Sequence, residues 1–222
     1  MRFFNRFTRF AELFIHLFYT TFQMLYGAWR ISKLEHPIVT IFGSSRLQHN
    51  TPFGKMAGIL GQRFIDNNIS VLTGGGPGIM EAASCNIILK GKAKALGIGV
   101  TGVEDRPKKC VAGYFQLRYF FARKWLLTEF SDGFVIFPGG FGTLDELAGV
   151  LTLIQTKRLK IVPIVLIGSE YWQPFVEWIE KEALKHGTIS KEDVDTFYLT
   201  DSLDDAFCWV LGKCEIIPNE KN

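Results

Sequence analysis

The sequence is organised around PGGFGTLDE, which runs from Pro138 to Glu146. The apolar run Gly133–Phe137 in front of it is typical of a buried strand, and the residues after it repeat with helical periodicity. Glycines allow a sharp turn and let backbone N–H groups come close to a ligand. Because a helix N-terminus has unpaired N–H donors and a partial positive charge, we expect that ligand to be a phosphate. The expected phosphate contacts are Gly139, Gly140, Gly142 and Thr143.

The carboxylate of Glu146 has two interpretations. In the first turn of the expected helix it would lie beside the bound phosphate, where it can act on whatever the phosphate carries. The tetrapeptide Thr143–Glu146 also matches a capping box, in which Thr143 caps the helix and Glu146 reaches back to the cap N–H. The glycines and the proline upstream favour the ligand site, because a helix cap needs no flexible backbone in front of it.

A second glycine-rich turn, TGGGPGIMEA at Thr73–Ala82, also leads from an expected strand into an expected helix. Position 79 is isoleucine, so the turn lacks the GxGxxG pattern of dinucleotide sites, and neither turn continues into the Gly-Lys-Ser/Thr of a P-loop. We therefore expect a ligand the size of a mononucleotide. The alternative is that these glycines only make tight turns.

Short apolar runs alternate with helical patterns from Pro37 onward, which is typical of a parallel sheet covered by helices on both faces. We expect an α/β fold, a Rossmann-like doubly wound sheet in three α/β/α layers, over residues 37–222. The expected strands are Ile38–Phe42, Ile69–Thr73, Ala95–Val100, Gly133–Phe137, Val162–Ile167 and an edge strand at Phe197–Thr200. The expected helices are Pro52–Asp66, Pro77–Lys90, Tyr119–Phe130, Phe141–Gln155, Tyr171–His186, and Ser202–Leu211 capped by Asp201.

Residues 1–36 form a separate N-terminal segment with an amphipathic helix, in which phenylalanines recur at helical spacing beside Arg2, Arg6 and Arg9. Three interpretations stay open: an apolar stripe packed on the domain or on a second subunit, a helix on a membrane surface, and a targeting peptide. Polar residues, among them Glu12 and His16, interrupt the apolar stretch and count against a spanning helix.

The composition indicates which kinds of binding partner and cofactor to expect. The 222 residues are 47% hydrophobic, enough for a sizeable core, and a net charge of +3 gives no large basic field, so we expect no nucleic-acid partner. The four cysteines show neither CxxC nor Cys/His spacing, which predicts no metal site, buried thiols and a reducing, cytoplasmic location. We expect no cofactor.

Two further groups are expected at the carboxyl edge of the sheet. The first strand ends in Gly43-Ser44-Ser45-Arg46, where Ser44 can bond a ribose or phosphate or simply cap the next segment. Arg123 and Lys124 interrupt an apolar helix, and since adjacent residues cannot share one helix face, at most one of them points into the site. Arg123 is preferred because its planar fork suits phosphate, with a solvated surface position as the alternative.

With these motifs in place, the chain resembles the LOG (Lonely Guy) family of phosphoribohydrolases, once labelled "possible lysine decarboxylases". The resemblance covers about Ile38–Gly168 and rests on GGGPGIMEA at Gly74–Ala82, the Arg123-Lys124 pair and PGGFGTLDE. It implies hydrolysis of the N-glycosidic bond of a nucleoside 5′-monophosphate, AMP or a cytokinin-type nucleotide, to free base and ribose 5-phosphate. It also implies a homodimer or larger homo-oligomer.

The resemblance assigns roles residue by residue. Arg123 and Glu146 match the catalytic pair. The implied substrate contacts are Ser44, Gly75, Gly76, Gly78, Met80, Lys124, Gly139, Gly140, Phe141, Gly142, Thr143 and Thr152. The segment Glu104–Gln116 carries no recognisable motif for the base. A second hypothesis, from another class, is a non-catalytic nucleotide-binding sensor or carrier of the same fold.

Overall fold

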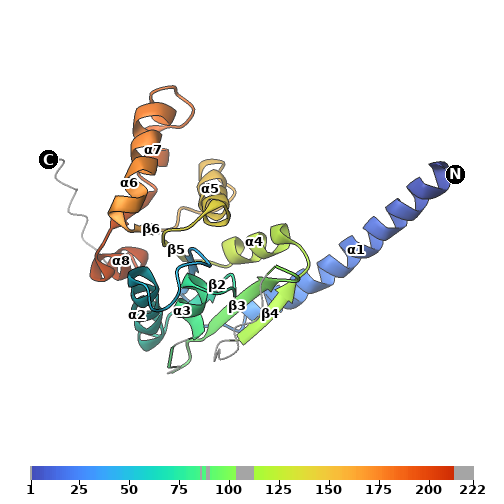
Figure 1. The fold of residues 1–222 in the computed structure, drawn as a ribbon, viewed down its shortest axis with the longest axis horizontal. Helices are drawn as coiled ribbons and strands as arrows, with labels where there is room; N and C mark the ends of the chain where they lie inside the picture. The colour runs from blue at the N-terminus through green and yellow to red at the C-terminus, as the bar shows by residue number, and fades with distance from the viewer. Residues whose placement is uncertain (1, 86, 89–90, 104–112, 213–222) are drawn as a thin grey trace.

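The computed structural model describes residues 2–85, 87–88, 91–103 and 113–212, which form one sheet flanked by helices (Figure 1). The sheet has the strand order β4-β3-β2-β1-β5-β6-β7, and every neighbouring pair is parallel. The fold class expected from the sequence, a Rossmann-like doubly wound sheet, is confirmed. The strands are β1 Ile38–Phe42, β2 Ser70–Thr73, β3 Ala95–Val100, β4 Gly113–Leu117, β5 Gly133–Ile136, β6 Ile164–Ile167 and β7 Phe197–Thr200.

The helices lie on both faces of the sheet. They are α1 Arg2–Ile31, α2 Pro52–Asp66, α3 Ile79–Cys85, α4 Phe120–Glu129, α5 Phe141–Gln155, α6 Ser169–Trp178, the π-helical η1 Ile179–Leu184, α7 Lys191–Val194 and α8 Leu203–Val210. Successive strand residues point to opposite faces, so Ile38 joins one apolar cluster and Val39 the other. The first cluster contains α4, α5 and α6, and the second contains α2, α3 and α8. The result is the expected three layers.

The order of the strands makes β1 the point from which the chain winds in both directions. From β1 the chain runs outward through β2, β3 and β4 on one side, and through β5, β6 and β7 on the other. The two glycine-rich turns follow β2 and β5, the neighbours of β1. In sheets of this kind, ligands bind outside the carboxyl ends of the strands where the winding direction changes.

Several boundaries differ from the expected ones. β4 was not predicted because this edge strand is only partly buried and carries no apolar run. The strand expected from Val162 begins at Ile164, after Pro163, which has no N–H to donate. α3 ends at Cys85, whereas a helix to Lys90 was predicted; residues 86, 89 and 90 lie outside the described part.

The cap of α8 is Ser202, whose side chain accepts a hydrogen bond from Asp205 N at 3.2 Å. The prediction of Asp201 as the cap is therefore wrong. Asp201 instead accepts a bond from Ser169 N at 2.8 Å, which ties α8 to the start of α6.

Two cysteines differ from the expected free thiols. Cys85 and Cys208 are disulfide-bonded, and the described residues include no free cysteine. The prediction of buried thiols is wrong for these two, because the fold rather than spacing along the chain decides which cysteines meet. Cys110 and Cys214 lie outside the described residues.

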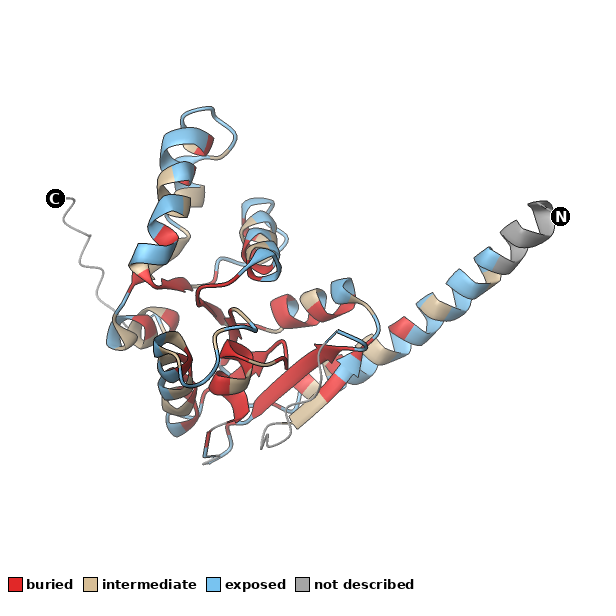
Figure 2. Cartoon of the chain, in the orientation of Figure 1, coloured by how far each residue is buried: buried red, intermediate tan, exposed pale blue. Residues whose placement is uncertain are grey.

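The N-terminal helix α1 extends away from the rest of the molecule, and only its C-terminal end enters the core (Figures 1 and 2). Ile31 and Leu34 belong to the first apolar cluster. In the described part of the chain, none of the helices combines the length and hydropathy that a membrane-spanning segment needs. The expected boundary near residue 36 stays a prediction.

Candidate active site

A cavity of about 820 Å³ lies at the carboxyl edge of the sheet, beside β1 and β5. Its walls come from segments far apart in the sequence. The loop 43–47 follows β1, and the turn 138–144 follows β5 and opens α5. Met80 of α3, Arg123 of α4, Glu146 of α5 and Tyr171 of α6 also line it. The cavity therefore lies where ligands bind in sheets of this topology.

An ion pair between Arg123 and Glu146 lies in the wall of this cavity. Arg123 Nη2 is 3.3 Å from Glu146 Oε1, and the two residues are only 7% and 9% exposed. Buried charges are costly unless they are paired, so each residue compensates the other. The sequence-based choice of Arg123 over its neighbour agrees with this placement, and the alternative of a solvated Arg123 is excluded.

Lys124 points elsewhere. Its Nζ donates hydrogen bonds to the backbone oxygen and to Oδ1 of Asp145, at 2.8 and 2.9 Å. It does not line the cavity. Lys124 instead ties α4 to α5 from outside the cavity.

The N-terminus of α5 faces the cavity without a side-chain cap. Gly140 is the N-cap residue, the helix begins at Phe141, and no described side chain bonds the cap. Thr143 therefore lies inside the first turn of α5, so the interpretation of Thr143–Glu146 as a capping box is wrong. Glu146 lies in the second turn, whereas the sequence predicted the first. Because no described side chain caps α5, its first N–H groups keep their anion-binding character.

The glycines of this turn have different surroundings. A Cβ added to Gly139 would lie 2.1 Å from Thr143 Oγ1, which no real Cβ could tolerate, whereas Gly140 and Gly142 face open space. The carbonyl of Gly139 also accepts a hydrogen bond from Tyr171 Oη at 2.6 Å. Close packing thus requires glycine at 139 alone, while Gly140, Phe141 and Gly142 are exposed in the cavity wall.

The second glycine-rich turn supports the site from behind. Gly78 has φ +71°, and a Cβ there would lie 2.4 Å from the carbonyl oxygen of Ser44. Ile79 N donates to that same oxygen at 3.1 Å, and Ser44 N donates to Pro138 O at 3.0 Å. Gly75, Gly76 and Gly78 do not line the cavity. This turn positions the loop after β1 against the turn after β5.

The remaining predicted contacts divide into two groups. Ser44 and Met80 line the cavity, and Ser44 Oγ also accepts a bond from Arg46 N at 3.1 Å. Thr152 does not line it, and its hydroxyl bonds Ala148 O one turn back along α5 at 2.7 Å.

Sequence reasoning did not identify Tyr171 or Phe53, which also line the cavity. Tyr171 could have been found, because it follows the carboxyl end of β6 at the same sheet edge. Phe53 lies at the start of α2, the helix that follows β1, and carried no distinguishing signal.

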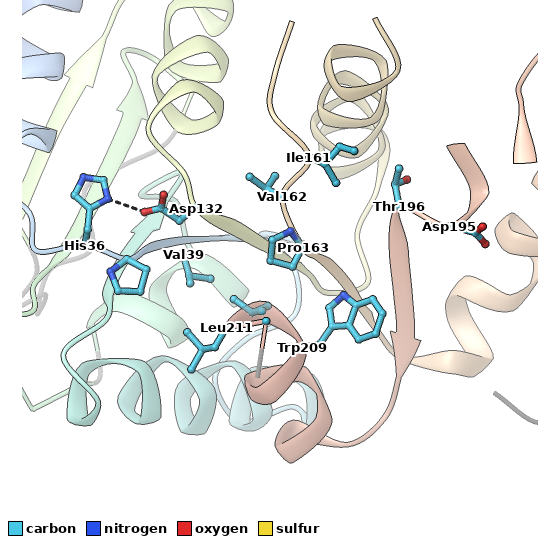
Figure 3. A pocket seen from close by; sticks show the side chains of 13 residues that line it. His36, Val39, Asp132, Ile161, Val162, Pro163, Asp195, Thr196, Trp209 and Leu211 are labelled. Atoms are coloured by element: carbon cyan, nitrogen blue, oxygen red, sulfur yellow. Dashed lines mark hydrogen bonds and ion pairs between the residues drawn. The ribbon is translucent and has the colours of Figure 1, made fainter. Parts of the chain in front are cut away.

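A second cavity, of about 750 Å³, lies at the opposite edge of the sheet, among the amino ends of β1, β5, β6 and β7 (Figure 3). Its main charged group is Asp132, whose carboxylate accepts from Ile38 N at 2.9 Å and contacts His36 Nδ1 at 2.6 Å and Lys160 Nζ at 3.3 Å. Burial raises the pKa of Asp132, but the bonds to Ile38, His36 and Lys160 outweigh it and hold that pKa below its ordinary value. These bonds lock β1 to β5, which is a structural role.

The described residues contain no group of three or more His, Cys, Asp or Glu side chains arranged to hold a metal ion. The first cavity combines a paired carboxylate with the uncapped N-terminus of a helix.

The chain is similar to several known proteins. The chain is 25% identical over 150 residues to the cytokinin riboside 5′-monophosphate phosphoribohydrolase of Rhodococcoides fascians, covering 66% of this chain and 76% of the relative. It is 29% identical over 162 residues to the enzyme of the same name, LOG1, of Arabidopsis thaliana, covering 68% and 72%. A solved structure, the molybdenum cofactor binding protein of Rippkaea orientalis, matches with a TM-score of 0.57 at 21% identity, over 79% of this chain and 96% of that one. This last likeness concerns the fold alone.

The family model described as "Possible lysine decarboxylase" matches residues 80–208, more than half of the chain. The matched segment includes the Arg123–Glu146 pair and the turn that opens α5. The chain belongs to this family, which is the LOG family.

Proposed function

We propose that the protein hydrolyses the N-glycosidic bond of nucleoside 5′-monophosphates and releases the free base and ribose 5-phosphate. The observation that carries the proposal is the buried Arg123–Glu146 pair in the wall of the cavity onto which the uncapped N-terminus of α5 opens. The names of the curated relatives support the same reaction class. The substrate would be AMP or a cytokinin-type nucleotide.

The phosphate would bind at the N-terminus of α5. The N–H groups at Phe141, Gly142 and Thr143 are the first of the helix, and the helix dipole adds a partial positive charge there. Arg46, an exposed cation in the cavity wall, would add attraction for the dianion. Phosphate binding energy would then hold the ribose in one orientation against Glu146.

Glu146 would act on the sugar. As the N-glycosidic bond lengthens, positive charge develops at the anomeric carbon, and a nearby carboxylate stabilises it. Glu146 would also accept a proton from the water whose oxygen forms the new bond to that carbon. The base leaves with the electron pair of the broken bond and takes up a proton. Arg123 would hold Glu146 in position through its ion pair.

The decarboxylase label does not fit the residues. A pyridoxal phosphate enzyme needs a lysine to form the Schiff base, and the described residues that line the cavity include none. The neighbouring Lys124 is bonded to Asp145 outside the cavity.

The test is to incubate the purified protein with AMP, with a cytokinin riboside 5′-monophosphate and with adenosine, and to separate the products by chromatography. The proposal expects free base and ribose 5-phosphate from the monophosphates, with much less base from adenosine, which has no phosphate to bind at α5. Tight nucleotide binding without any release would instead support the sensor or carrier. Equal cleavage of adenosine and AMP would contradict the role given to α5.

A further inference from the structure

The N-terminal helix α1 exposes apolar side chains along most of its length. It spans 30 residues, about 45 Å at the usual rise per residue. Among the described residues, eleven large hydrophobic side chains between Phe10 and Trp29 are exposed. Figure 2 shows the N-terminal part of the helix standing clear of the domain, while its C-terminal end lies against it. A surface of this kind is unusual on a soluble monomer and marks an interaction site.

The exposed side chains form one row along the helix. Phe14, Phe18, Phe22, Leu25 and Trp29 follow one another at intervals of four, four, three and four residues, which keeps them on one side of an α-helix. Their exposed fractions run from 53% for Trp29 to 64% for Phe14.

A polar row, with the same intervals, lies on the opposite side. Glu12, His16, Thr20, Gln23 and Gly27 are each two residues before a member of the apolar row, about 200° around a helix with 3.6 residues per turn.

The C-terminal part of this row, from Thr20 to Gly27, faces the domain. Thr20 is 2% exposed, and Gln23 Oε1 accepts a bond from Arg118 N at 3.1 Å. A Cβ at Gly27 would lie 2.5 Å from Leu126 Cδ1. The apolar row therefore points away from the domain. An apolar stripe packs on the domain only at the C-terminal end of α1, where Met24, Ala28 and Ile31 contact the first apolar cluster.

The width of the apolar face favours a lipid surface over a partner helix. The exposed hydrophobic residues from Phe10 to Trp29 occupy roughly two thirds of the helix circumference at about 100° per residue. A coiled-coil partner covers a much narrower seam, whereas a helix lying in the membrane interface immerses a broad face. Seven of the eleven residues are aromatic, the side chains that prefer the interfacial region.

The charge on this segment is complementary to anionic lipid. Between residues 9 and 33, Arg9, Arg30 and Lys33 are balanced only by Glu12. Lys33 Nζ lies 3.3 Å from the ring centroid of Trp29, so a cation stands at the border of the apolar face. Basic residues beside an apolar helix face are attracted to the negative surface of a membrane.

We propose that α1 lies in the surface of an anionic lipid bilayer with the Phe14–Trp29 row immersed, and so holds the domain at a membrane. The proposal is independent of the proposed function, since α1 contributes no residue to the cavity beside β5.

The test is sedimentation of the full chain with vesicles of phosphatidylcholine alone and of phosphatidylcholine mixed with phosphatidylserine. Binding is expected mainly to the mixed vesicles and should weaken as salt is raised. The triple variant Phe14→Ser, Phe18→Ser, Phe22→Ser should bind at least tenfold more weakly, and Arg9→Gln about fivefold more weakly to the mixed vesicles.

The control is Ile161→Ser, which removes a hydrophobic side chain that is 82% exposed and lies outside α1. It should bind vesicles like the unaltered protein, and circular dichroism should show every variant folded. Failure of the unaltered protein to bind mixed vesicles would overturn the proposal. Ultracentrifugation that finds self-association abolished by the triple variant, without vesicle binding, would assign the row to a second copy of the chain instead.

Discussion

Arg123 and Glu146 form a buried ion pair across two helices, α4 and α5, that meet over the carboxyl edge of the sheet. Neither charge is buried alone, and the pair lines a cavity that water or a ligand can enter. Such a pair contributes little net stability, but the removal of one partner leaves a charge without compensation. The pair is therefore a means of holding a carboxylate at the surface of the cavity.

Arg123→Ala should lower the free energy of unfolding by about 2 kcal/mol, because Glu146 loses its compensating charge in a partly closed site. The double variant Arg123→Ala, Glu146→Gln should recover part of that loss. Urea denaturation of both single variants and the double variant gives the coupling energy. Strictly additive losses would show that the two side chains do not stabilise each other.

Asp132→Asn should lower the free energy of unfolding near neutral pH by about 1 kcal/mol, because charge-assisted bonds are lost at a half-exposed site where solvent screens them. The bonds from Ile38, His36 and Lys160 hold the pKa of Asp132 below its ordinary value of 3.8. Ionised Asp132 therefore stabilises the fold above pH 3.8, and this contribution disappears as the pH falls through the lowered pKa.

Thermal melting of Asp132→Asn and of the unaltered protein measures how this stabilisation depends on pH. The range from about pH 2.5 to about pH 7 includes the ordinary pKa of an aspartate. The two curves should converge at the acid end. A constant difference at every pH would contradict the assignment.

At the scale of the elements, the site depends on the turn that begins α5. Gly139 packs against Thr143 and bonds Tyr171, whereas Gly142 faces open space one residue inside the helix. These two glycines, equal in the sequence, have different functions in the structure.

Gly139→Ala should destabilise the protein by about 2 kcal/mol, since the added methyl must displace Thr143 and the N-terminus of α5. It should also weaken binding of inorganic phosphate. Gly142→Ala is the matched control: its methyl meets nothing within 4 Å, and alanine favours a helix, so its melting temperature should equal or exceed that of the unaltered protein. Calorimetric melting and phosphate titration compare the two variants. Equal melting temperatures would mean that Gly139 is not packed as described.

Much of this architecture is readable from the sequence, because continuous apolar runs and glycine turns define the central strands. β1, β3, α2 and α5 have the predicted bounds. β4 escaped prediction because an edge strand needs no apolar run, and its burial depends on α1 and β3, which pack on it only in the fold.

The sequence also predicted only part of the candidate site. The family resemblance paired Arg123 with Glu146, but the roles of the glycines in Thr73–Ala82 depend on a contact with Ser44 that only the folded chain makes. Tyr171 reaches Gly139 from α6, 32 residues away, a distance over which local patterns carry no information.

Over the whole chain, the described residues present two surfaces suited to binding. The carboxyl edge of the sheet carries the cavity where the chain changes its winding direction, and α1 presents an apolar face that the domain does not cover. Asp132 lines the cavity at the amino edge, and its bonds to Ile38, His36 and Lys160 stabilise the sheet. Membrane attachment through α1 would leave the carboxyl edge free to exchange a soluble nucleotide.

In the proposed reaction, Glu146 performs the hydrolysis beside the N-terminus of α5. The most direct measurement compares release of free base from AMP, or from a cytokinin riboside 5′-monophosphate, by the unaltered protein and by Glu146→Gln, with nucleotide affinity measured by calorimetry on both. Glutamine keeps the shape and can still accept from Arg123, but it cannot take a proton from water, so kcat should fall about 10³-fold while the Kd changes little. Turnover by Glu146→Gln at the rate of the unaltered protein would show that Glu146 does not act on the water or the sugar.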